Sequence, residues 1–137
     1  MIKDTLAIRA HKGSIANASA GNKAAWLALF DENAAVYDPV GPSPHDPEGK
    51  GAYGLTEIAQ FWDRMIGPLD LTLIPHKRIP CGDKVAAVIM TAAIRAGGAK
   101  SFIEMVAIYE VNEAGKIIVL KIYWDVDAAA EQVLGGG

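Results

Sequence analysis

The chain has 137 residues with a formal net charge of −3; 51% of the residues are hydrophobic and 7% are aromatic. This length predicts a single domain over residues 1–137, and the apolar content excludes a disordered chain. No strongly basic segment is present, which argues against a nucleic-acid partner. The aliphatic surplus of so small a chain indicates that apolar side chains line a pocket or an interface as well as a core.

The N-terminal segment and the cysteine content indicate the cellular compartment in which we expect the protein. The first ten residues contain Lys3, Asp4 and Arg9 and lack the apolar stretch of a signal peptide. No apolar run approaches the ~20 residues of a membrane span, so no membrane partner is expected. Cys81 is the only cysteine and cannot form an intrachain disulfide. We therefore expect a protein of the reducing cytoplasm.

The first part of the chain predicts two helices and a strand. Apolar residues at helical spacing predict a helix over residues 5–20, and Asn22 is a suitable N-cap for a second helix over residues 23–30. Residues 34–38 predict a short strand that ends at Asp38, because the residue before a proline favours extended geometry.

A long loop and a third helix follow. Residues 39–54 contain four prolines and four glycines, which predicts an irregular connection. Thr56 is the expected N-cap of the helix, and Gly67-Pro68 is the expected stop. The apolar residues of this helix recur at i, i+3, i+4, i+7 and i+8, as Ile58, Phe61, Trp62, Met65 and Ile66.

The second half of the chain predicts four consecutive strands, over residues 69–78, 84–95, 101–111 and 116–126. Helices first and antiparallel strands afterwards indicate the α+β class, with a curved, antiparallel-rich sheet wrapped around three N-terminal helices. Such a sheet makes a cone with an inner wall of Ala, Val, Ile and Met. The glycines at 135–137 are expected to form a frayed end.

Four segments carry a resemblance that covers nearly the whole chain. They are LFDENAAVYDPVG at 29–41, PEGKG and EIAQFW within 47–62, NEAGKI at 112–117 and IYW at 122–124. In this register the chain resembles the ketosteroid isomerase family, part of the SnoaL-like superfamily that shares the fold of nuclear transport factor 2. The resemblance implies a cone-shaped fold, a hydrophobic pocket and a homodimer formed through the convex face of the sheet.

The resemblance also implies three catalytic positions, of which this chain keeps one. In the isomerases an Asp base moves a proton between two carbons of an enone, while a Tyr and a protonated Asp donate hydrogen bonds to the developing oxyanion. Asp38 matches the base, but Ser14 stands at the position of the Tyr and Ala107 at that of the protonated Asp. Loss of one such donor typically costs ~10²–10³ in rate. Tyr109, two residues from Ala107 and on the same strand face, is the best internal substitute.

Other residues are candidates for ligand contact. Trp124 matches an aromatic residue at the mouth of the family's pocket, and Met105 and Ala107 belong to the expected pocket wall. Tyr53 is a further candidate donor. Trp26 and Trp62 lie on the apolar faces of the second and third helices, where they contribute to the core or to the pocket, and the apolar faces favour the core.

Asp38 is the principal candidate for chemistry. An apolar surrounding would raise the pKa of its carboxyl group into a useful range for a base. The alternative is that Asp38 only caps the turn at Pro39. The family match favours the functional interpretation.

No metal ion or other cofactor is expected. His11, His45 and His76 lie far apart in the sequence and have no Cys partner at metal-binding spacing. No glycine-rich dinucleotide motif is present between a strand and a helix. Cys81 has no activating neighbour in sequence except Lys84.

Two functional hypotheses therefore stand side by side. The first is proton-transfer chemistry, either isomerisation or cyclisation, on a small hydrophobic carbonyl compound, with Asp38 as the base and Tyr109 or Ser14 giving electrophilic help. The alternative is a non-catalytic module for hydrophobic-ligand binding or dimerisation that has lost the oxyanion donors.

Overall fold

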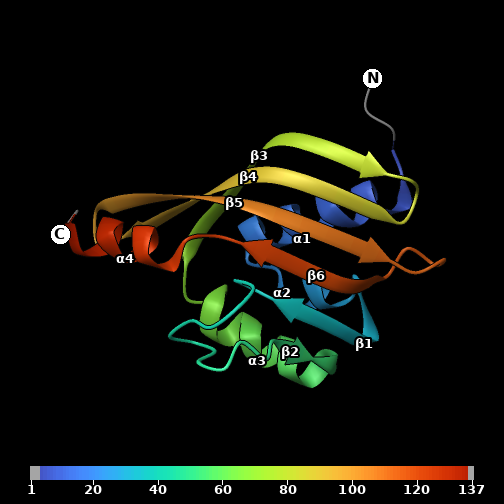
Figure 1. Ribbon diagram of the computed structural model, residues 1–137, viewed down its shortest axis with the longest axis horizontal. Helices are drawn as coiled ribbons and strands as arrows, with labels where there is room; N and C mark the ends of the chain where they lie inside the picture. The colour runs from blue at the N-terminus through green and yellow to red at the C-terminus, as the bar shows by residue number, and fades with distance from the viewer. Residues whose placement is uncertain (1–3, 136–137) are drawn as a thin grey trace.

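The computed structural model describes residues 4–135, in which a curved six-stranded sheet packs against helices (Figure 1). The helices are α1 (Leu6–Ala20), α2 (Lys23–Leu27), α3 (Gly54–Met65) and α4 (Val126–Gly135). The strands are β1 (Phe30–Tyr37), β2 (Ala52–Tyr53), β3 (Asp70–Cys81), β4 (Val85–Ala96), β5 (Ala99–Val111) and β6 (Ile117–Tyr123). The expected α+β class is confirmed.

The sheet has the strand order β2-β1-β6-β5-β4-β3, and its neighbours are antiparallel except for β1 and β6. These two strands come from opposite ends of the sequence and pair in parallel, with Val36 opposite Leu120. Their carboxyl ends therefore lie at the same edge of the sheet. The residues that directly follow β1 and β6 are brought together by this pairing.

Helix α1 packs across β3, β4 and β5, behind the sheet in Figure 1. Its N-cap is Thr5, whose hydroxyl oxygen accepts a hydrogen bond from the Ile8 N–H at 3.1 Å, and it ends at Gly21, whose φ of 70° suits glycine. The buried side of the helix is mostly Ala and Ile but includes His11 and Ser14. His11 and Ser14 therefore place polar side chains on the inner side of this helix.

Side chains alternate between the two faces of the central strands. Met90 of β4 and Tyr109 of β5 point inward and are 1% exposed. Ile89 and Val106 lie opposite each other on the outer face and are 42% and 40% exposed. The sheet therefore has apolar side chains on both faces.

The structure corrects three local predictions in the first half of the chain. The second helix ends at Leu27 rather than at residue 30, because Phe30 is buried, pairs with Ile117 and begins β1. The loop over residues 39–54 contains the two-residue strand β2. Helix α3 begins at Gly54, before the expected cap at Thr56.

The C-terminal segment was predicted wrongly. The last strand ends at Tyr123 instead of residue 126, and α4 follows it. Asp125 starts this helix, because its Oδ1 accepts hydrogen bonds from the N–H groups of Asp127 and Ala128 at 3.0 and 3.1 Å. Gly135, expected in a frayed end, is the last residue of α4, and residues 136–137 lie outside the described residues.

Candidate functional site

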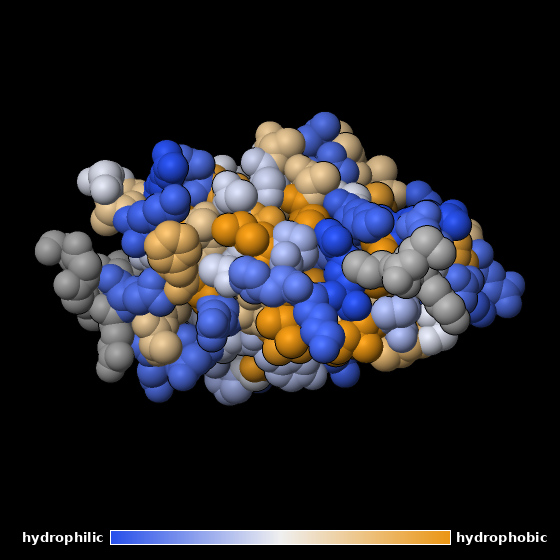
Figure 2. Space-filling view, turned by 90° about the horizontal axis from the view of Figure 1, so that it is seen from above, coloured by the Kyte–Doolittle hydropathy of each residue, from blue (hydrophilic) through white to orange (hydrophobic). Residues whose placement is uncertain are grey.

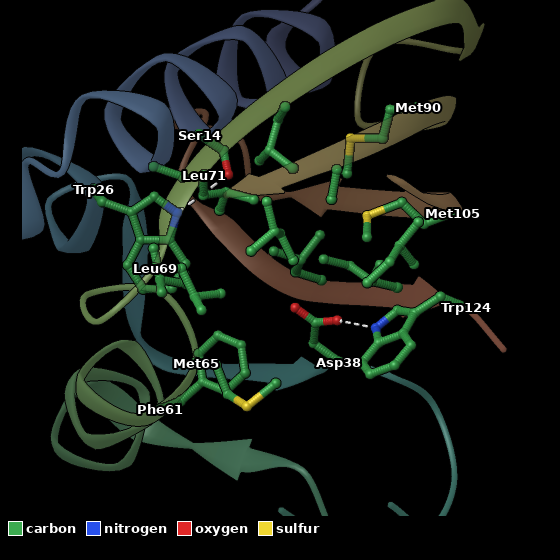
Figure 3. Close-up of a pocket in the computed structure, with 18 of the residues that line it drawn as sticks. Ser14, Trp26, Asp38, Phe61, Met65, Leu69, Leu71, Met90, Met105 and Trp124 are labelled. Atoms are coloured by element: carbon green, nitrogen blue, oxygen red, sulfur yellow. Dashed lines mark hydrogen bonds between the residues drawn. The ribbon is translucent and has the colours of Figure 1, made fainter. Parts of the chain in front are cut away.

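An open cavity of about 120 Å³ lies between the inner face of the sheet and helices α1 and α3 (Figure 3). Its wall is almost entirely aliphatic, aromatic or methionine. Among the described residues of its wall, five carry side-chain nitrogen or oxygen atoms, namely Ser14, Trp26, Asp38, Tyr109 and Trp124. An apolar cavity with a few polar groups is typical of a site for a small hydrophobic ligand.

Asp38 and Trp124 meet at one side of the cavity, since they follow the parallel strands β1 and β6. The indole N–H of Trp124 donates a hydrogen bond of 2.6 Å to Asp38 Oδ1 (Figure 3). Asp38 is half-buried, and burial raises the pKa of its carboxyl group from 3.8 to about 6, although the hydrogen bond from Trp124 opposes the rise. At neutral pH the group is ionised and has the basicity that a general base needs.

Tyr109 reaches the same cavity from β5, the central strand next to β6. Burial raises the pKa of its phenol to about 12, while the nearby Ser14 hydroxyl opposes this shift and the charge of Asp38 adds to it. Ser14 also accepts a hydrogen bond of 3.2 Å from the indole N–H of Trp26 (Figure 3). The structure thus brings Ser14, Asp38 and Tyr109 into one cavity.

The candidate ligand contacts divide into two groups. Met105 and Trp124 line the cavity. Ala107, Tyr53 and Trp62 do not belong to its wall.

Each of these three residues lies in another environment, either in the hydrophobic core or at the edge of the sheet. Ala107 is fully buried in the hydrophobic core. Trp62 is 3% exposed and packs against Trp26, with their ring centroids 5.2 Å apart. Tyr53 is 52% exposed at the β2 edge, where its hydroxyl group hydrogen-bonds that of Tyr37.

Trp26 also lines the cavity, although the sequence favoured a place in the core over one in the pocket. Its place on the apolar face of α2 is consistent with a core role, and it is indeed only 2% exposed. One side of the indole nevertheless faces the cavity, and its N–H meets Ser14. A signal was available, because a buried indole N–H requires an acceptor.

Within residues 4–135, no three His, Cys, Asp or Glu side chains gather closely enough to bind a metal ion. Among the helices of this same region, none has both the length and the apolar character that a membrane crossing demands.

A protein-family model matches most of the sequence. The model of the SnoaL-like domain family matches residues 13–120. No curated protein matches the sequence.

Solved structures give closer parallels. RV0760c from Mycobacterium tuberculosis is 29% identical, with a TM-score of 0.87 over 93% of this chain and 96% of that chain. Its complex with estradiol-17β-hemisuccinate has the same identity and a TM-score of 0.85 over 90% and 97% of the two chains. The Δ5-3-ketosteroid isomerase of Mycobacterium sp. is 29% identical, with a TM-score of 0.84 over 90% and 96%. A computationally designed 17-OHP binder is 28% identical, with a TM-score of 0.83 over 91% and 95%.

Proposed function

Since the chain belongs to the SnoaL-like domain family, we propose that it binds a small hydrophobic carbonyl compound and transfers a proton on it. The observation that carries the proposal is the Asp38 carboxyl group, which faces an apolar cavity and has a pKa of about 6. Proton abstraction next to a carbonyl needs such a base together with a donor for the developing oxyanion.

The proposed reaction uses two groups of the cavity. Asp38 takes a proton from the carbon next to the carbonyl, and the electrons of the broken C–H bond move to give an enolate. Tyr109 donates a hydrogen bond to the enolate oxygen, and Asp38 then returns the proton to another carbon of the same compound. Because burial raises the pKa of Tyr109 to about 12, this donor is weaker than an ordinary phenol, and we expect a slow enzyme.

We propose a steroid-like ketone as the ligand class. The similar proteins include an isomerase named for a Δ5-3-ketosteroid, a complex with estradiol-17β-hemisuccinate and a designed 17-OHP binder. Aliphatic side chains such as Leu71 and Ile103, together with Trp124, suit a flat apolar skeleton. The cavity of about 120 Å³ accommodates one end of such a molecule, and its open side leaves room for the remainder.

A β,γ-unsaturated 3-ketosteroid provides the test, because its isomerisation creates a conjugated enone that absorbs in the ultraviolet. We expect slow turnover by the wild-type protein and a loss of at least about 100-fold in D38N, since the base is removed. Quenching of tryptophan fluorescence measures binding separately, because Trp26 and Trp124 line the cavity. Binding of the steroid with no turnover by the wild-type protein would contradict the catalytic proposal.

A binding protein without chemistry is the second candidate. It is favoured by Ser14 and Ala107, which stand where the family's two oxyanion donors are expected. In this case the steroid quenches tryptophan fluorescence in the wild-type protein and in D38N alike, and neither protein produces the conjugated enone.

We also propose that the protein forms a homodimer through the outer face of its sheet and acts in the cytoplasm. Ile89, Val106 and Tyr123 lie side by side across β4, β5 and β6 and are 40–45% exposed. Ile74 and Ile79 extend the exposed apolar surface to β3. Figure 2, which views the molecule from above Figure 1, shows hydrophobic residues between hydrophilic ones on the surface. Contiguous apolar surface of this kind is typical of an interface. The lone Cys81 suits a reducing compartment.

A further inference from the structure

A second, smaller cavity of about 80 Å³ adjoins the apolar one. Its wall is formed by β1, by helix α3 and by the loop that leads from β1 to β2. Asp38, Phe61 and Met65 line both cavities, and Figure 3 shows them together on one side of the apolar cavity. Trp124 donates to Asp38 Oδ1, so Oδ2 is the carboxyl oxygen left for a second partner.

The second cavity differs from the first in the chemistry of its wall. Three residues besides Asp38 bring titratable or charged side chains to it, namely His45, Asp46 and Arg64. We call it the polar cavity. Since one water molecule needs ~10–15 Å³ of such volume and two or more polar partners, a polar cavity of this size suits several water molecules.

The loop side of the polar cavity is held in place by Asp46. Its Oδ1 accepts a hydrogen bond from the Lys50 N–H at 3.0 Å, and its Oδ2 accepts one from the Gly51 N–H at 2.7 Å. The backbones of Ser43 and Asp46 also exchange hydrogen bonds of 3.0 and 3.1 Å. Gly51 has a φ of 76°, and a Cβ at this position would lie 2.9 Å from the Val36 carbonyl oxygen, so the loop packs closely on β1. The polar cavity is therefore a built part of the fold.

His45 is the wall residue best suited to carry a proton between the polar cavity and the solvent. Both carboxylate oxygens of Asp46 already accept backbone N–H groups, and the guanidinium of Arg64 does not release a proton. His45 lines the cavity and is also exposed at the molecular surface. An imidazole gains and loses a proton readily near neutral pH.

We propose that Asp38 exchanges its proton with solvent through water in the polar cavity and the imidazole of His45. Asp38 becomes a carboxylic acid when it takes the proton of the ligand. That acid gives its proton to a water molecule while the water gives one to His45, so one O–H bond of Asp38 breaks, one N–H bond of His45 forms and the water is regenerated. The reverse transfer brings a solvent proton to Asp38, which delivers it to the enolate. The inference rests on the proposed function and adds that the returned proton comes from solvent.

A high-resolution crystal structure of the ligand-free protein tests the route without any turnover. We expect ordered water within hydrogen-bond distance of Asp38 Oδ2 and a continuous chain of hydrogen-bonded water from there to an imidazole nitrogen of His45. A polar cavity without water at Asp38, or one in which His45 has no link to that water, would overturn the inference.

Isomerisation of a β,γ-unsaturated 3-ketosteroid in D₂O tests the exchange itself. Mass spectrometry of the conjugated enone gives the ratio of deuterated to undeuterated product, and enone incubated with the protein in D₂O corrects for exchange after the reaction. We expect most of the wild-type product to carry deuterium and the ratio to fall by roughly tenfold or more in H45A. Added imidazole should restore the ratio in H45A, because it replaces the missing group, whereas a purely structural role of His45 would not be rescued in this way.

The matched control is H76A, which removes an exposed histidine of β3 that hydrogen-bonds Thr91 and lies outside both cavity walls. It should leave the deuterium ratio unchanged, and equal effects of H45A and H76A would overturn the inference. Isomerisation in which the wild-type product retains the ligand's hydrogen would also overturn it, while the proposed catalysis would stand. A water chain from Asp38 to His45 in a protein that does not turn over the steroid would sustain the route and reject the proposed catalysis.

Discussion

Two titratable residues, the half-buried Asp38 and the buried His11, change stability with pH in opposite directions. The pKa of Asp38 is raised to about 6 because burial disfavours its charge. The pKa of His11 is lowered from 6.5 to about 4, chiefly by burial and then by the positive charges of Arg78 and Lys12. Ionisation of Asp38 therefore lowers the free energy of unfolding. His11 lowers the free energy of unfolding at a pH at which the unfolded chain binds a proton on this residue and the folded chain does not.

The substitution D38N is expected to stabilise the fold at neutral pH. Between pH 3.8 and about 6 the folded protein holds the Asp38 proton more tightly than the unfolded chain does, so the free energy of unfolding decreases as pH rises through this range. Asparagine carries no charge and can still accept a bond from Trp124. Urea denaturation at pH 7.5 should show D38N to be more stable by about 1–3 kcal/mol, with the difference vanishing below pH 4. A D38N variant less stable than wild type at pH 7.5 would contradict a raised pKa of the Asp38 carboxyl group.

His11 provides the opposite pH dependence. Its ring is fully buried, neither nitrogen has a hydrogen-bond partner within residues 4–135, and it meets Tyr109 edge-on at 5.0 Å. Because its pKa is depressed in the folded state, its contribution to stability is complete above pH 6.5 and is lost as pH falls through 4. Phenylalanine has a similar shape and does not titrate.

The variant H11F should therefore match the wild type at pH 7.5 and gain on it by up to about 3 kcal/mol at pH 4. The measurement is the difference in the free energy of unfolding between the two proteins at each pH, which cancels the titration of groups common to both. A difference that does not change with pH would show that His11 is not a buried neutral imidazole.

At the scale of elements, local sequence patterns could predict the helices and strands that have a regular spacing of apolar residues. The spacing of apolar residues predicted α1, α3 and the four long strands, because each of these buries one face along its length. The contact between Asp38 and Trp124 depends on the parallel pairing of β1 with β6, whose residues are more than 80 positions apart. No local pattern encodes such a pairing. The local sequence left the role of Asp38 open, and the family resemblance is what favoured Asp38 and Trp124 as site residues.

Misassigned elements have equally specific causes. Phe30 continues the apolar face of α2, so only its partner in the sheet, Ile117, shows that a strand has begun. Helix α4 is short and follows a strand whose apolar alternation extends formally to Val126, and the decisive feature is the cap at Asp125. The apolar face of α2 favoured the core over the pocket for Trp26, and the cavity beside this residue is a property of the assembled fold.

Helix α4 also provides hydrogen-bond partners for the backbone of β5, beyond the point where β6 ends. The N–H of Phe102 donates to the Gln132 side-chain oxygen at 2.7 Å, and the amide nitrogen of Gln132 donates to the Phe102 carbonyl oxygen. We expect Q132A to lower the free energy of unfolding by no more than about 1.5 kcal/mol, while hydrogen exchange at the Phe102 amide becomes at least tenfold faster. Unchanged exchange at this amide would contradict the role of Gln132 at the strand edge.

At the scale of the whole molecule, the aliphatic surplus has two locations. One part lines the cavity, and another part lies on the outer face of the sheet around Ile89 and Val106. The alternation of the strands places Met90 and Met105 toward the cavity and their sequence neighbours toward the outside. A small chain can therefore be rich in aliphatic residues without having an unusually large core.

The proposed dimer can be tested on the outer face alone. V106E places a charge at the centre of the exposed row and leaves the cavity untouched, because Val106 points away from it. We expect the wild-type protein to sediment as a dimer and V106E as a folded monomer in analytical ultracentrifugation. K121E, on the adjacent strand β6, reverses a charge on the same face of the sheet without removing an apolar side chain and is the control. A monomeric wild-type protein would contradict the proposal.

The most direct test of the central claim is the dependence of kcat/KM on pH for isomerisation of a β,γ-unsaturated 3-ketosteroid. If Asp38 is the base, kcat/KM rises with pH as the carboxyl group loses its proton, with a midpoint near pH 6, and then levels off. The residual rate of D38N should show no such midpoint. A wild-type profile that is flat between pH 4.5 and 7.5, or one that D38N shares, would contradict the assignment of Asp38 as the base.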